Sequence, residues 1–247
     1  MKQISILLVL LLNAGCSNDS DVFNSTKVTV IDDMTGHHKS RPIADSILSL
    51  YDFPSDSEQD ATFRYVLLTD KRLNPVQEIS LANGNVSERQ NSRDEPTYRD
   101  LQILNFYKAV RNAVESFADL YSKDSSLEYS ECYATIASEM EILAASNANQ
   151  KIIIIYSDLQ ENDDDFSCYS SDDMRLLIDR PNEVFRLLNK RHHMPANLKG
   201  VTVYLVYEPI SREEDNAFGL MANFYKKILK VRGARVVVQA EGKYFHP

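Results

Sequence analysis

Short apolar runs alternate with longer amphipathic segments between residues 27 and 240. The apolar runs predict strands at 27–32, 61–70, 77–82, 151–158, 201–208 and 234–240, of which 77–82 is polar enough for an edge strand. Apolar residues that recur every three or four positions predict helices at 40–53, 98–121, 128–145, 170–191 and 211–233, with a break near Pro181. Strands separated by helices indicate an α/β fold with a doubly wound, mostly parallel sheet flanked by helices.

The strand at 151–158 contains four consecutive isoleucines. Four adjacent residues of a strand cannot all face one side, so we expect helices to cover both faces of the sheet. In such sheets ligands bind outside the carboxyl ends of the strands, at the point where the strand order reverses. The pattern places that point between the first strand and the isoleucine-rich strand.

Candidate ligand residues follow these two strands. Asp33 and Thr35 come directly after the first strand, and Asp158 ends the isoleucine-rich strand. Carboxylate and hydroxyl oxygens are the ligands preferred by Mg²⁺. The alternative is that the same residues form turns or helix N-caps, since Asp and Thr are common in both.

The stretches "IDDMTGHH" and "IIIIYSDLQEN" resemble the von Willebrand factor A domain. In that family a metal-ion-dependent adhesion site uses an Asp-x-Ser/Thr-x-Ser motif after the first strand, a Thr from a second loop and an Asp after the fourth strand. The resemblance implies that Asp33, Thr35, Thr97 and Asp158 hold Mg²⁺, or Mn²⁺ or Ca²⁺, with a partner's carboxylate completing the coordination. His37 departs from the motif, because the family has a Ser at that position.

Two cysteines lie on the same side of the predicted sheet. Cys132 is in the first turn of the helix before the isoleucine-rich strand, and Cys168 is in the loop after that strand. Both positions belong to the carboxyl edge, so the thiols can meet, and an exported protein would oxidise them to a disulfide. The alternative is two unrelated buried thiols.

The amino terminus has the pattern of a secretion signal. Lys2 precedes an apolar stretch that is too short to span a bilayer. The sequence Ala14-Gly15-Cys16 resembles the lipobox of bacterial lipoproteins, with Asn13 where that family usually has Leu. It implies a signal peptide at 1–15, a lipidated Cys16 with a polar tether at 16–26, and a von Willebrand factor A-like domain at 27–247. The expected location is the bacterial cell envelope, periplasmic or surface-facing, with the lipid as membrane anchor.

Charge and motifs narrow the function classes. The net charge of −9 and the lack of a basic face argue against nucleic-acid binding, and the basic segments at 186–193 and 226–235 are read as solvated helix faces. "VIDDMT" lacks the second aspartate of the haloacid dehalogenase motif, and no glycine-rich phosphate loop is present. We therefore expect an adhesion-type protein that binds a protein or envelope component. The alternatives are a metal-dependent envelope hydrolase and a structural lipoprotein with a vestigial site.

Overall fold

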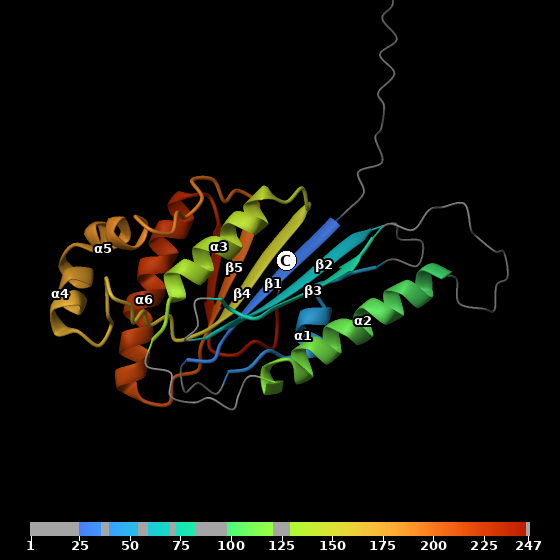
Figure 1. The fold of residues 1–247 in the computed structure, drawn as a ribbon, viewed down its shortest axis with the longest axis horizontal. Helices are drawn as coiled ribbons and strands as arrows, with labels where there is room; N and C mark the ends of the chain where they lie inside the picture. The colour runs from blue at the N-terminus through green and yellow to red at the C-terminus, as the bar shows by residue number, and fades with distance from the viewer. Residues whose placement is uncertain are drawn as a thin grey trace, which may run out of the picture.

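The computed structural model describes residues 25–35, 40–53, 59–69, 73–82, 98–120 and 129–245. Within these residues, six strands form one sheet in the order β3-β2-β1-β4-β5-β6 (Figure 1). The strands are β1 (Ser25–Asp33), β2 (Asp60–Leu68), β3 (Val76–Leu81), β4 (Gln150–Tyr156), β5 (Val201–Val206) and β6 (Arg235–Gln239). The helices are α1 (Ala44–Leu48), α2 (Tyr98–Ser116), α3 (Cys132–Ala145), α4 (Ser171–Asp179), α5 (Pro181–Leu188) and α6 (Arg212–Val231), with a 3-10 turn, η2, at Ala118–Leu120.

The sheet is mostly parallel, as predicted. All neighbouring strands are parallel except the edge strand β3, which pairs antiparallel with β2. β1 lies next to β4 at the centre, so the strand order reverses between them, as expected from the sequence. The predicted α/β class is therefore confirmed, and the carboxyl ends of β1 and β4 meet at one edge.

Helices cover both faces of this sheet (Figure 1). One core contains Ile153 and Ile155 together with residues of α3, α4, α5 and α6, and the other contains Ile152 and Ile154 together with residues of α1 and α2. All four isoleucines are fully buried. The alternation of side chains along β4 therefore fills both cores, which is the reason for a continuous apolar run.

Several element boundaries differ from the prediction, and local contacts account for three of them. β1 begins at Ser25, inside the predicted tether, because Ser25 N donates to Asn149 Oδ1 at 3.0 Å. The helix predicted at 40–53 is only the five-residue α1, since Arg41 precedes it and reaches back to Asp32. The helix predicted at 128–145 begins at Cys132, because the backbone of Ser130 is paired elsewhere.

Helix α6 follows its sequence signals closely. Ser211 is the N-cap and its hydroxyl accepts from Glu214 N at 3.1 Å, and Gly233 has φ +93° just beyond the end. That backbone conformation favours glycine over residues with a Cβ. No helix of the described residues is long and apolar enough to cross a membrane.

Candidate functional site

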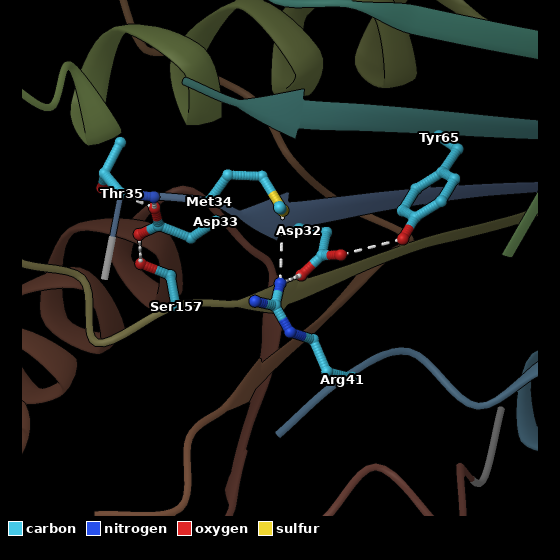
Figure 2. Close-up of polar contacts among 7 residues, drawn as sticks. All are labelled: Asp32, Asp33, Met34, Thr35, Arg41, Tyr65 and Ser157. Atoms are coloured by element: carbon cyan, nitrogen blue, oxygen red, sulfur yellow. Dashed lines mark hydrogen bonds and ion pairs between the residues drawn. The ribbon is translucent and has the colours of Figure 1, made fainter. Parts of the chain in front are cut away.

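A carboxylate with hydroxyl partners lies at the end of β1. Asp33 Oδ1 accepts hydrogen bonds from the backbone N of Thr35 at 2.8 Å and from its hydroxyl at 2.6 Å. Asp33 Oδ2 accepts from the Ser157 hydroxyl at 2.5 Å, directly after β4 (Figure 2). Asp33 and Ser157 are both fully buried. The two central strands therefore do meet at Asp33, through a serine that the sequence analysis did not select.

A second serine joins this group from the start of α3. The hydroxyls of Thr35 and Ser130 lie 3.1 Å apart. Ser130 is fixed by two backbone hydrogen bonds to Asn162, each 3.0 Å long. We name Asp33, Thr35, Ser130 and Ser157 the hydroxyl cluster. Ser130 supplies a hydroxyl of the kind that was expected from Thr97. Thr97, Cys16, His37 and His38 lie outside the described residues.

Ser130 had a detectable signal in the sequence. It stands two residues before Cys132, whose position at the carboxyl edge follows from the order of helix and strand. The same reasoning, applied to hydroxyl residues, would have selected it. Helix α2 runs in the same direction as β1, so its first described residues, from Tyr98, lie toward the opposite edge (Figure 1).

Asp158 belongs to the same edge but has its own local partner. Its Oδ1 accepts from Gln160 N at 2.9 Å and its Oδ2 from Gln160 Nε2 at 3.1 Å. Burial raises the pKa of Tyr169, and the charges of Asp158 and Asp33 raise it further. Both predicted carboxylates thus act on one side chain at this edge.

Asp32, the residue before Asp33 on β1, points to the other face of the sheet, as alternation along a strand requires. Its buried carboxylate accepts from Tyr65 Oη at 2.9 Å and forms an ion pair with Arg41 Nη1 at 3.1 Å (Figure 2). Arg41 also contacts Met34 Sδ at 3.2 Å. We call Asp32, Arg41 and Tyr65 the loop clamp, because the ion pair joins the end of β1 to the segment that leads into α1.

Glu161 ties the loop after β4 to the first turn of α3. Its buried carboxylate accepts from Tyr133 N at 2.6 Å, a backbone donor that has no partner within the helix. Burial raises the pKa of Glu161 well above its usual value, while the Tyr133 hydrogen bond acts in the opposite direction. The helix start that carries Ser130 is therefore held by a residue from the neighbouring loop.

Both predicted disulfide partners are free thiols in the structure. Cys132 Sγ lies 3.9 Å from Ser157 Oγ, and Cys168 Sγ lies 3.6 Å from Met221 Sδ on α6. The predicted disulfide is thus not formed here, because the two sulfurs pack against different partners. Burial raises the pKa of Cys132 well above its usual value and that of Cys168 to about 12, so both thiols are held neutral and neither is an activated nucleophile.

The hydroxyl cluster offers oxygen ligands of the kind a hard cation takes. In an octahedral Mg²⁺ shell with bonds of about 2.0–2.1 Å, adjacent ligand oxygens lie about 2.9 Å apart. The 3.1 Å between Thr35 Oγ1 and Ser130 Oγ is compatible with two such positions. Thr35 donates its only hydroxyl proton to Asp33, so the lone pairs of its oxygen remain for other contacts. Among the described residues, no three His, Cys, Asp or Glu side chains form a metal-binding group.

No protein-family model and no curated protein sequence matches this chain. An aerotolerance-related membrane protein from Bacteroides fragilis aligns with 9% identity and a TM-score of 0.36, over 87% of this chain and 90% of its own. The human COPII-coat protein Sec24c aligns with 12% identity and a TM-score of 0.41, over 90% of this chain and 31% of its own. At these identities and TM-scores neither likeness bears on the function of this chain.

Proposed function

We propose that this protein is a lipid-anchored bacterial envelope protein that binds a protein or envelope partner at the carboxyl edge of its sheet through a divalent metal. The hydroxyl cluster carries this proposal, because Thr35 and Ser157 donate to the carboxylate of Asp33 and Ser130 contacts Thr35, so three separate segments form one polar group. Thr35, Ser130 and Asp158 would contribute ligands directly or through water, with Asp33 orienting the hydroxyls. A bound Mg²⁺ would supply a positive charge that attracts a partner's carboxylate.

The chemistry of the cluster supports a hard metal over a soft one. Its oxygens belong to a carboxylate and three hydroxyls, and both neighbouring thiols are neutral. Mg²⁺, Mn²⁺ and Ca²⁺ prefer such oxygen ligands, whereas zinc and copper prefer imidazole and thiolate. The resemblance of Asp33 and Thr35 to the von Willebrand factor A motif points to the same ions.

The direct test is calorimetric titration of Mg²⁺, Mn²⁺ and Ca²⁺ into residues 16–247 with Cys16→Ser, which retain the whole described sheet. We expect saturable binding by this parent and none by Asp33→Asn. Ser130→Ala should weaken binding by about tenfold or more, the usual effect of losing a residue that orients or ligates a metal. Ser146→Ala is the matched control, because that hydroxyl lies at the other end of α3 and should leave affinity unchanged.

Two results would contradict the metal proposal. The first is that the parent, folded by circular dichroism, binds none of the three ions. The second is that Ser130→Ala and Ser146→Ala lower affinity equally, because the effect would then not belong to this edge. Either outcome would direct the search to partners that bind without metal.

The anchor has its own test. Cells that express the full chain should incorporate labelled palmitate into the protein, and Cys16→Ser should abolish the label and release the protein from membranes. Cys168→Ser is the control thiol substitution and should remain labelled. Labelled palmitate in Cys16→Ser would show that the lipobox assignment is wrong.

A further inference from the structure

Acidic and basic residues are concentrated in different segments of the second half of the chain, and Arg191 of the basic segments pairs with Asp165 of the acidic ones at 2.9 Å. The segments 158–173 and 208–215, which follow β4 and β5, contain eleven Asp and Glu but one Arg. The segments 142–157, 184–207 and 216–240 contain ten Lys and Arg but no Asp or Glu. The sequence alone suggested ordinary solvated helix faces for the basic residues at 186–193 and 226–235, because both segments look helical.

The fold gathers part of this positive charge at the amino edge of the sheet. Lys27 and Lys151 are register partners on β1 and β4, while Lys199 precedes β5 and Arg235 begins β6. The backbone of Lys199 packs within 3.4 Å of where a Cβ on Gly233 would lie, and Gly233 N donates to the carbonyl of Lys230. We name these five residues (Lys27, Lys151, Lys199, Lys230, Arg235) the basic edge.

Two members of the basic edge, Lys199 and Lys230, carry accessible positive charge. Lys199 and Lys230 are exposed, and within the described residues neither forms an ion pair. Val231, beside Lys230, is 82% exposed and adds an apolar side chain. Three acidic residues also lie toward this edge: Asp60 and Asp100 on the side of β1 away from β4, and the exposed Glu141 near the end of α3. The five basic residues outnumber them.

The acidic segments 158–173 and 208–215 lie at the carboxyl edge, which we call the acidic edge. This edge is too far away to cancel the positive charge of the basic edge. A strand of nine residues at about 3.3 Å per residue separates the two edges by roughly 25–30 Å. This is about three Debye lengths at physiological ionic strength, so each edge presents its own potential.

The chain enters the fold at the basic edge. β1 begins at Ser25, beside Asn149, and only eight residues separate Ser25 from Cys16. Eight residues reach at most about 29 Å. A lipid on Cys16 would therefore keep this edge near the membrane, whereas the hydroxyl cluster lies at the opposite edge.

We propose that the basic edge is a membrane-binding surface for anionic phospholipids, which orients the domain with its acidic, ligand-binding edge away from the bilayer. The positive charge at the point of chain entry complements an anionic lipid surface, and the acidic edge is repelled by it. The location near a membrane rests on the proposed anchor, but the affinity for anionic lipid does not.

The test is sedimentation of the unlipidated parent (residues 16–247, Cys16→Ser) with vesicles of phosphatidylcholine alone or mixed with phosphatidylglycerol. We expect binding only to the anionic vesicles, and weaker binding as salt is raised. A lysine near an anionic surface contributes about 1 kcal/mol, which is about fivefold in partitioning. Lys199→Glu with Lys230→Glu should therefore weaken binding by at least about 25-fold.

The matched control is Lys108→Glu with Arg175→Glu, which changes the net charge equally on exposed faces of α2 and α4. It should leave binding within about threefold of the parent's, since these residues lie beyond the reach of screened charge. Equal losses in the two double variants, equal binding to neutral vesicles, or no binding of the parent would each overturn the proposal. The assay contains neither lipid anchor nor added metal, so its failure leaves the function proposed above intact.

Discussion

Removing the cation of the loop clamp is the most informative perturbation of the structure. Asp32 has a side chain that is 1% exposed, and its ion pair with Arg41 joins β1 to the segment before α1. Arg41→Met keeps most of the apolar stem but removes the guanidinium that lies 3.1 Å from Asp32 Oδ1. The carboxylate then stays buried with less compensation for its lost hydration.

The loss of folding stability expected for Arg41→Met lies between two known limits. Breaking a fully buried pair by removing one partner costs about 3–5 kcal/mol, whereas exposed pairs contribute about 0–1 kcal/mol. Arg41 is 47% exposed and its partner is not, so we expect Arg41→Met to lower the free energy of unfolding by about 2 kcal/mol. The double variant Asp32→Asn with Arg41→Met should be destabilised less than Arg41→Met alone, because no buried charge remains.

Urea unfolding followed by circular dichroism measures these free energies. Arg111→Met is the control, because Arg111 is similarly exposed but pairs with Asp45, whose side chain is 79% exposed. It should cost less than about 1 kcal/mol. If the two single variants have the same stability, the ion pair of the clamp is no stronger than a surface pair.

Three further outcomes follow from buried groups. Because burial raises the pKa of Glu161 above its usual 4.5, the folded state holds the proton more tightly than the unfolded state does. The parent should therefore lose stability relative to Glu161→Gln as the pH rises above about 4.5 in unfolding titrations, and parallel curves would contradict this. Gly242→Ala would place a Cβ 2.3 Å from the hydroxyl of the buried Tyr156, so we expect about 1–3 kcal/mol of destabilisation by urea unfolding, and an unchanged midpoint would refute the clash. Cys132 and Cys168 should resist alkylation in the folded protein and should react when the protein is unfolded without reductant, as followed by mass spectrometry. If neither thiol reacts after unfolding, the two cysteines form the predicted disulfide.

The sequence by itself determined the class of fold and the position of its central strands. Apolar periodicity is a local property, and burial on both faces leaves a continuous run such as Ile152 to Ile155 whatever the neighbours are. The end of β1 at Asp33 and the N-cap at Ser211 were likewise readable, because they depend on residues close in the chain. The two aspartates at the β1 end were correctly placed at the carboxyl edge for the same reason.

Only the tertiary structure decided which hydroxyls reach Asp33 and where the charges gather. Ser130 and Ser157 are 95 and 124 residues from their partners Thr35 and Asp33. The sequence can place both serines at the carboxyl edge, but it does not show which side chains they contact. The basic edge similarly draws on β1, β4, α6 and the starts of β5 and β6. Parallel strands aligned side by side bring the ends of distant segments within a few ångströms, and that alignment depends on the whole sheet rather than on any one segment.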